Sequence, residues 1–253
     1  MALKIRKILV SQPKPSSEKN PYFELAEKNN LKIDFRPFIK VECVCSKEFR
    51  QQKIDILAHT AVIFTSKTAV DNYFRICEEM RVTVPDSMKY FCITEAIAFY
   101  LQKYIVYRKR KIFFGKSKIT DLVDVMQKHK DDKFLVPLSD QHKKEIPDTL
   151  TKHGFNYTKA VLYKTVSSDL SDLYSINYDL LVFYSPSGIR SLLKNFPKFE
   201  QNDIKIASFG TATAKAVKEA GLRLDIQAPM PEAPSMTMAL DKFISEFNKN
   251  CKK

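Results

Sequence analysis

The chain has 253 residues, of which 44% are hydrophobic and 28% charged; this composition excludes a disordered or fibrous protein, and at roughly 150 residues per domain it predicts about two domains. Lys and Arg number 42 against 29 Asp and Glu, so the formal net charge is 42 − 29 = +13, and we expect an anionic partner. The five glycines never lie within three positions of one another, which excludes both the Gly-rich dinucleotide loop and the P-loop.

Cysteine and histidine usage argues against a metal site. The five cysteines are scattered without a C-x-x-C pair, and the four histidines lack the H-E-x-x-H spacing, so we expect reduced thiols and no metal. No apolar run approaches the ~18 residues that span a bilayer, and the segment 1–12 has too short an apolar core for a secretory signal. These patterns predict a cytoplasmic protein without membrane contact.

Short apolar strands alternate with amphipathic helical stretches along the chain, which is typical of parallel sheets flanked by helices in an α/β fold. Apolar residues at i, i+3, i+4 and i+7 predict helices over 70–77 and 236–247, the second with Ser235 as its N-cap. The predicted strands are Ile5–Val10, Ala61–Thr65, Tyr90–Ile93, Phe134–Pro137, Leu180–Tyr184 and Ile204–Phe209.

Two long extended stretches break this pattern. Residues 31–43 alternate apolar and polar positions, interrupted at Pro37, and residues 155–166 form a second stretch. At about 3.3 Å per residue each would reach roughly 40 Å, too long for one compact domain. We therefore predict two similar lobes joined by a two-stranded antiparallel linker. Lobe 1 is 1–37 plus 165–253, and lobe 2, 38–164, is inserted into it.

The two lobes also resemble each other in sequence. Ser66 matches Ser185 at an offset of 119, the pair Thr94-Glu95 matches Gly210-Thr211 at 116, and Thr120 matches Thr237 at 117. Three matches in the same order at nearly constant offset indicate a duplicated α/β unit.

A basic stretch, residues 103–118, holds seven cations and no acid. Such a run is compatible with a nucleic-acid patch. Apolar residues interleave it in clusters, among them Ile112, Phe113 and Phe114, and these favour a solvated sheet edge.

Hydroxyl residues and glycines follow the predicted strands in both lobes, where helices begin. Helix N-termini offer unpaired N–H groups and the positive end of the helix dipole, and in parallel sheets ligands bind at this edge. We therefore expect these turns to face one cleft and to bind carboxylates or phosphates; the alternative is that the hydroxyls are only N-caps. The residues are Thr65, Ser66, Lys67 and Thr94 in one lobe and Ser185, Ser187, Gly188, Gly210, Thr211 and Thr213 in the other.

An ordered set of segments resembles the uroporphyrinogen-III synthase family over nearly the whole chain. The segments are residues 64–70 (FTSKTAV), 160–165 (AVLYKT), 183–188 (FYSPSG), 207–215 (ASFGTATAK) and 234–237 (PSMT). The resemblance implies a cyclase, a lyase without cofactor. It would act on a linear tetrapyrrole with eight carboxylates, hydroxymethylbilane, and close the ring to uroporphyrinogen III with loss of water and inversion of ring D.

The resemblance also implies a role for Tyr163, whose phenol would help the substrate hydroxyl to leave; the alternative is an aromatic that only packs in the linker. Three positions depart from the family pattern: Lys67, Ala212 and the segment 138–140. Lys67 would add a carboxylate partner. The expected protein is a monomer that binds this small molecule and no nucleic acid. Two other interpretations stay open: a nucleic-acid binder that uses the basic stretch, and a non-catalytic receptor for a polycarboxylate.

Overall fold

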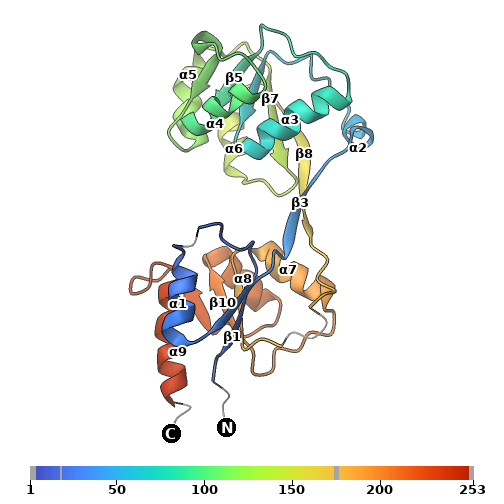
Figure 1. The fold of residues 1–253 in the computed structure, drawn as a ribbon. Coiled ribbons are helices and arrows are strands. Elements are labelled where there is room, and N and C mark those ends of the chain that lie inside the picture. The colour runs from blue at the N-terminus through green and yellow to red at the C-terminus, as the bar shows by residue number, and fades with distance from the viewer. Residues whose placement is uncertain (1–3, 18, 174–176, 251–253) are drawn as a thin grey trace. The chain divides into compact units, whose positions relative to one another are not determined.

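The chain forms two compact units, each built around its own sheet (Figure 1). The computed structural model describes residues 4–17, 19–173 and 177–250. Unit 1 consists of Met1–Lys40 and Val166–Lys253, and unit 2 is Val41–Thr165. Unit 1 thus ends its first segment at Lys40 rather than at residue 37, and it resumes at Val166 rather than at residue 165.

Unit 1 carries a five-stranded sheet in the order β11-β10-β9-β1-β2. All of its strands run parallel, and the helices that connect them pack on the sheet. Its elements are β1 (Lys7–Val10), α1 (Pro21–Asn29), β2 (Lys32–Phe35), β9 (Leu180–Phe183), α7 (Pro186–Asn195), β10 (Lys205–Phe209), α8 (Thr211–Glu219), β11 (Ile226–Ala228) and α9 (Met236–Asn250).

Unit 2 carries a six-stranded sheet in the order β3-β8-β7-β4-β5-β6. The five strands from β8 to β6 are parallel. Its strands are β3 (Ile39–Cys43), β4 (Ala61–Phe64), β5 (Lys89–Cys92), β6 (Ile112–Phe114), β7 (Phe134–Ser139) and β8 (Tyr157–Ser167). Its helices are α2 (Ser46–Gln51), α3 (Lys67–Glu79), α4 (Glu95–Tyr100), α5 (Val123–Gln127) and α6 (Glu145–Lys152), with three 3₁₀ turns, η1 (Leu101–Lys103), η2 (Lys109–Lys111) and η3 (Ile119–Leu122).

The parallel strands of the two sheets follow the same order. When β11-β10-β9-β1-β2 is written beside β6-β5-β4-β7-β8, the strand β9 corresponds to β4, β10 to β5, and β1 to β7. In unit 1 the pair β1-β2 comes first in the chain, whereas its counterpart β7-β8 comes last in unit 2. The two units are therefore the same α/β arrangement with the chain cut at different places.

The two passages of the chain between the units pair with each other in an antiparallel sense. The Ser168 N–H donates to the Phe38 carbonyl and the Val44 N–H to the Leu162 carbonyl, both at 2.9 Å, so residue numbers rise on one strand as they fall on the other. The alternation over 31–43 predicts one long extended stretch, but the first passage is not a single strand. It divides at Pro37 into β2 and β3, because proline has no N–H for a sheet and Phe38 turns into the core of unit 1.

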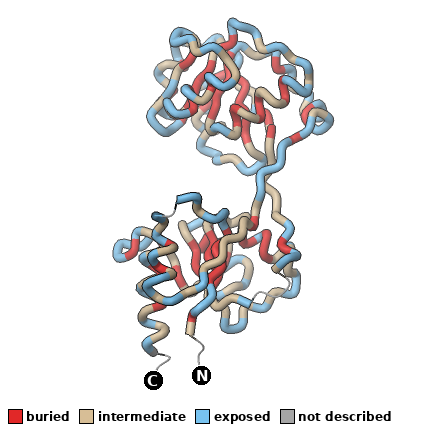
Figure 2. The backbone as a smooth tube through the Cα atoms, in the orientation of Figure 1, coloured by how far each residue is buried: buried red, intermediate tan, exposed pale blue. Residues whose placement is uncertain are grey.

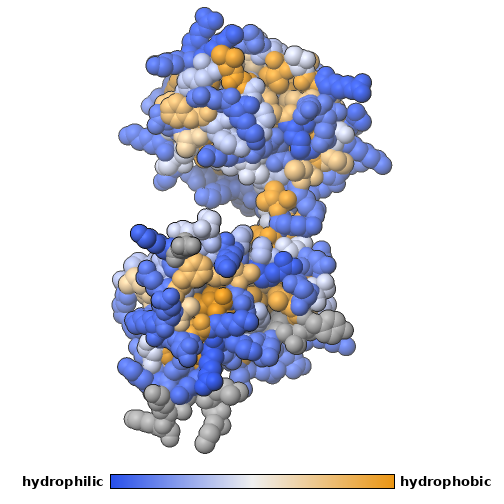
Figure 3. All heavy atoms as spheres, in the orientation of Figure 1, coloured by the Kyte–Doolittle hydropathy of each residue, from blue (hydrophilic) through white to orange (hydrophobic). Residues whose placement is uncertain are grey.

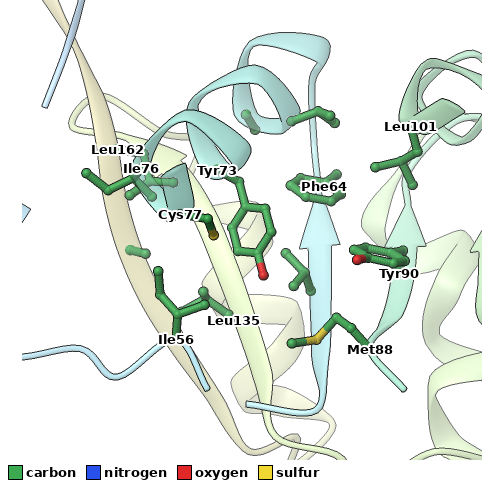
Figure 4. Close-up of a cluster of buried hydrophobic side chains, with 14 of the residues drawn as sticks. Ile56, Phe64, Tyr73, Ile76, Cys77, Met88, Tyr90, Leu101, Leu135 and Leu162 are labelled. Atoms are coloured by element: carbon green, nitrogen blue, oxygen red, sulfur yellow. The ribbon is translucent and has the colours of Figure 1, made fainter. Parts of the chain in front are cut away.

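Buried residues concentrate on the strands and on one face of each helix (Figure 2). In unit 2 the α3 face of the sheet is covered by a cluster in which Phe64 contacts both Tyr73 and Tyr90, with ring centroids 5.5 and 6.1 Å apart (Figure 4). The apolar stripe over 70–77 therefore forms the buried face of α3, as predicted. The visible outer surface of both units is mostly hydrophilic (Figure 3). Within the described ranges, no helix has the length and apolar character that crossing a bilayer requires.

The predicted strands all occur, with ends that shift by one or two residues. The apolar triplet 112–114 of the basic stretch forms β6, which lies at the edge of its sheet, as expected. β11, a strand of three residues, is not among the predicted strands.

Phe38 anchors the start of the linker in unit 1, so removal of its ring should destabilise that unit. Its ring is 1% exposed and lies 5.5 Å from the Phe183 ring, and its carbonyl accepts hydrogen bonds from Ser168 and Ser191. We expect Phe38→Ala to lower the free energy of unfolding of unit 1 by about 3–5 kcal/mol, measured by urea denaturation. Met238→Ala, at a position of unit 1 that is 50% exposed, is the matched control and should change it by less than about 0.5 kcal/mol. Equal effects of the two substitutions would contradict this anchoring role.

Candidate functional site

In unit 2, two hydroxyl residues begin helices at the carboxyl edge of the sheet. Ser66 follows β4 and caps α3, its Oγ accepting a hydrogen bond from the Ala69 N–H at 3.0 Å. Thr94 follows β5 and caps α4, with the Ile97 N–H 3.3 Å from its Oγ. Both hydroxyls thus act as N-caps. The first N–H groups of an α-helix have no partner within the helix, so they are the donors that a ligand at this edge would meet.

Tyr163 lies at the same edge, on β8, opposite Ser139 at the end of β7. Its hydroxyl oxygen is 3.3 Å from Ser66 Oγ, although β7 separates β8 from β4 in the sheet. Its ring packs against the apolar cluster of unit 2. The residue therefore combines packing in the strand with a hydroxyl group at the N-terminus of α3.

The turn after β7 fixes the backbone around Tyr163. The Asp140 N–H donates to the Tyr163 carbonyl at 3.1 Å. The Asp140 carboxylate accepts from the Ser139 hydroxyl and from the Thr165 N–H, both at 2.9 Å. In the sequence this segment stands out only as a departure from the family pattern, because no spacing rule links residue 140 to residues 163 and 165.

Thr65 and Lys67 flank the cap of α3. Thr65 is half-buried, whereas Lys67 is exposed and its Nζ lies 5.2 Å from the centroid of the Tyr100 ring. Asp71, one helical turn further on, is occupied by other donors: Tyr104 and Tyr100 at 2.5 and 2.9 Å and Lys103 at 3.1 Å. Partial burial opposes its ionisation, but these hydrogen bonds outweigh burial and lower the pKa of Asp71. In the described part of the chain Lys67 has no ion pair, so its charge is available to a ligand.

The turn after β6 is also rich in N–H groups, but the protein fills it with its own carboxylate. Asp121 Oδ2 accepts from the backbone N–H groups of Lys116, Ser117 and Lys118 at 3.1, 2.8 and 3.0 Å. These bonds, that from Lys118 foremost, lower the pKa of Asp121. Gly115 permits the close approach, since a Cβ there would lie 2.8 Å from the Asp121 Cβ. A ligand at this edge would therefore find the β4 and β5 turns open and the β6 turn taken.

In unit 1 the turn after β9 repeats the arrangement of Ser66. Ser185 caps α7, its Oγ accepting from the Gly188 N–H at 3.2 Å. Pro186 occupies the first helical position and has no N–H, so fewer backbone donors are present than in α3. Gly188 is buried, and a Cβ there would lie 3.2 Å from the Phe183 ring. Ser187 is half-buried and accepts a hydrogen bond from Arg190 at 2.8 Å.

The turn after β10 differs because its N-cap is Gly210. Its φ of 84° and ψ of 150° form a conformation that is essentially restricted to glycine. Without a side chain the cap leaves the first N–H groups of α8 uncovered. Thr211 is exposed at the first position of this helix, whereas Thr213 is 2% exposed and lies inside unit 1.

The predicted site residues therefore form one set in each unit. In unit 2, Ser66, Lys67 and Tyr163 lie around the N-terminus of α3, and Thr94 begins the next helix. In unit 1, the residues of the β9 and β10 turns begin neighbouring helices, α7 and α8. Across the described residues, no three His, Cys, Asp or Glu side chains gather in a way that would hold a metal ion.

Fold and helix starts together define an α/β protein of two similar units, one inserted into the other, with capped helix N-termini at the carboxyl edge of each sheet. Residues 20–238 match the family described as Uroporphyrinogen-III synthase HemD. A uroporphyrinogen-III synthase of Chlorobaculum parvum is 22% identical over 250 residues, which cover 93% of this chain and 98% of that protein.

Solved structures agree in fold. The uroporphyrinogen-III synthetase of Helicobacter pylori has a TM-score of 0.58 at 18% identity, over 96% of this chain and all of that one. A mutant uroporphyrinogen III synthase of Thermus thermophilus has a TM-score of 0.51 at 15% identity, over 96% of this chain and 99% of its own. The chain belongs to the uroporphyrinogen-III synthase family, and the resemblance found in the sequence is confirmed.

The stabilisation of the turn after β6 by Asp121 should depend on pH. Because the folded-state pKa is lowered, the stabilisation of this turn is fully present above the unfolded pKa and is lost as the pH falls through the folded pKa. In an NMR titration the amide resonances of Lys116, Ser117 and Lys118 should share one midpoint below the ordinary aspartate value. Asp121→Asn is the control and should abolish the shared transition. A shared midpoint at or above the ordinary value would contradict the arrangement.

Proposed function

We propose that this protein cyclises hydroxymethylbilane to uroporphyrinogen III, with loss of water and inversion of ring D. The observation that carries the proposal is the family match over residues 20–238, because it includes the helix starts of both units and Tyr163. The family is one of enzymes of tetrapyrrole biosynthesis, and its substrate is a small tetrapyrrole.

The substrate's charge fits the chain. Hydroxymethylbilane carries eight carboxylates, and the protein carries a net charge of +13. We propose that the first N–H groups of α3 and α4 in unit 2, and of α7 and α8 in unit 1, donate to these carboxylates. The Lys67 ammonium, held over the Tyr100 ring and free of an ion pair within the described residues, would add a charge-assisted hydrogen bond.

The reaction needs little chemical assistance from the protein, because the substrate itself expels its leaving group. The pyrrole nitrogen lone pair expels the neighbouring hydroxyl, the C–O bond breaks, and an azafulvene remains as the electrophile. We propose that the Tyr163 phenol donates its proton to the departing hydroxyl, so that water leaves, and recovers a proton when ring closure releases one. Ser66, 3.3 Å away, orients that phenol. The larger contribution of the protein is to hold the four pyrroles in the geometry that inverts ring D.

The nucleic-acid interpretation receives less support. In the basic stretch, Lys103 pairs with Asp71 at 3.1 Å and Arg108 with Asp86 at 3.3 Å, so part of its charge is already neutralised. A nucleic-acid partner would have to displace these pairs. We propose that the protein works in the cytoplasm, which the free thiols of Cys43, Cys45, Cys77 and Cys92 support. We propose also that it acts as a monomer.

A coupled assay tests the function. An enzymatic source supplies hydroxymethylbilane, and the ratio of type III to type I uroporphyrinogen is measured with and without the protein. We expect type III to dominate when the protein is present. Type I product alone, as forms without catalysis, would overturn the catalytic proposal and leave the polycarboxylate receptor.

Substitution of the hydroxyl residues should reduce turnover only several-fold. Ser66→Ala and Ser185→Ala leave the backbone N–H groups in place, and each removes one helix cap, of roughly 0.5–1.5 kcal/mol. Thr213→Ala also leaves them in place and changes a side chain that is 2% exposed. Initial rates and urea denaturation of each variant check this. Ser66→Thr is the matched control, since threonine keeps both the cap and a partner for Tyr163. Complete loss of turnover in any folded alanine variant would identify a dedicated catalytic hydroxyl instead.

Tyr163→Phe separates catalysis from packing. The substitution keeps the ring against the core of unit 2 and removes only the donor, so stability should stay near that of the native protein. We expect the turnover number to fall by about 10²-fold or less, because general-acid help is typically worth about 10²- to 10⁴-fold and the pyrrole nitrogen supplies most of the driving force. The type III product should persist. Unchanged turnover with a lowered melting temperature would assign Tyr163 to packing alone.

A further inference from the structure

Two tyrosines that the predicted site does not include meet at the carboxyl edge of the unit 1 sheet. Tyr184 lies between the last residue of β9 and the cap Ser185, and Tyr22 is in the first turn of α1, which follows the neighbouring strand β1. Their hydroxyl oxygens are 2.6 Å apart. The Tyr22 backbone N–H is held by Asn20 Oδ1 at 3.0 Å, so the start of α1 fixes the pair from one side.

The rings hold both hydroxyls in place. The Tyr22 ring meets the Phe35 ring edge-on at 5.5 Å, and Phe35 ends β2. The Tyr184 ring lies 5.6 Å from the Phe209 ring, which ends β10 just before Gly210. Tyr184 therefore lies beside both turns of unit 1 that contain predicted site residues.

The number of protons on the two hydroxyls determines which tyrosine donates the hydrogen bond between them. Two phenols carry two protons, and their mutual hydrogen bond uses one. Tyr22 is only 7% exposed, and among the described residues its hydroxyl has no partner except Tyr184. If Tyr184 were the donor, the Tyr22 proton would be buried without an acceptor, which is unfavourable. Tyr22 is therefore the donor, and the Tyr184 proton is left for a group outside the pair.

Both phenols keep their protons at neutral pH. Burial first, and Tyr184 second, raise the pKa of Tyr22 far above its ordinary value. Burial also raises the pKa of Tyr184, although the hydrogen bond from Tyr22 acts in the opposite direction. The half-buried Tyr184 hydroxyl is thus a neutral donor, made stronger by the bond it accepts.

We propose that Tyr184 donates a hydrogen bond to a carboxylate of the substrate, and that Tyr22 is the positioning residue that directs its proton. The inference rests on the proposed function. The duplication supports it, because the offset of 119 between Ser66 and Ser185 also aligns Tyr184 with Thr65, a predicted site residue of unit 2. Phenylalanine at both positions would supply the same packing, so we infer that the two hydroxyls serve to form hydrogen bonds.

Three variants test the proposal: Tyr184→Phe, Tyr22→Phe and the double variant. Each is measured for KM and kcat with hydroxymethylbilane, for the Kd of uroporphyrin III by its fluorescence, and for melting temperature. We expect Tyr184→Phe to raise KM and Kd about tenfold with kcat within about twofold, because a hydrogen bond to a charged group is lost. Tyr22→Phe should raise them only about twofold, since Tyr184 keeps its hydroxyl.

The double variant distinguishes binding from structure. Tyr184→Phe alone leaves the buried Tyr22 hydroxyl without a partner and should lower the melting temperature. The double variant removes both hydroxyls, so its melting temperature should return to that of the native protein while KM and Kd stay about tenfold raised. A double variant with native KM and Kd would overturn the proposal. If the native protein gives only type I product, the proposed function fails, and the Kd of uroporphyrin III still decides whether Tyr184 binds a carboxylate.

Discussion

Parallel pairing of the strands sets where the helices of both units begin. When every strand of a sheet runs the same way, all the turns that lead from strand to helix lie at one edge, and each brings a helix N-terminus with its unpaired N–H groups. In this chain Ser66, Thr94 and Ser185 cap those helices, and Gly210 leaves one without a side-chain cap. The fold thus gives each unit unpaired backbone N–H groups at helix starts without any Gly-rich loop. That agrees with a substrate that carries its own leaving group and needs mainly to be held.

The duplication explains how one arrangement serves both units and where they differ. The two sheets share their strand order, yet the chain enters unit 1 at β1 and unit 2 at β3, so the insertion separates β2 from β9. The equivalent turns then diverge in chemistry. In unit 2 a phenol, Tyr163, reaches Ser66 from β8, and in unit 1 a phenol follows β9 directly as Tyr184. Each unit thus carries a tyrosine near a serine that caps a helix: the Tyr163 hydroxyl contacts Ser66, and Tyr184 precedes Ser185 in the chain.

Periodicity and turn chemistry predicted most of the fold, because each core strand is a short apolar run and each cap a local feature. The stripe over 70–77 and the caps Ser66, Ser185 and Ser235 follow from residues within one turn of one another. The extended stretch is interrupted at Pro37, as predicted. The first segment of unit 1 does not end there, however, since only the tertiary structure reveals that Phe38 turns into unit 1. Contacts between distant segments could not be predicted from the sequence. Nothing near Tyr163 in the chain indicates its contact with Ser66, and nothing near Asp121 indicates that it fills the turn after β6. Tyr184 could have been found, because the repeat aligns it with Thr65.

We propose that the first N–H groups of helices in unit 1 and in unit 2 donate hydrogen bonds to carboxylates of the tetrapyrrole substrate. Amide hydrogen exchange measured with and without uroporphyrin III tests it most directly, because it reports on the backbone donors that no side-chain substitution removes. We expect exchange to slow in the presence of the ligand at the first residues of α3 in unit 2 and of α8 in unit 1. Slowing confined to one unit, or absent from both helix starts while the ligand is bound, would contradict it.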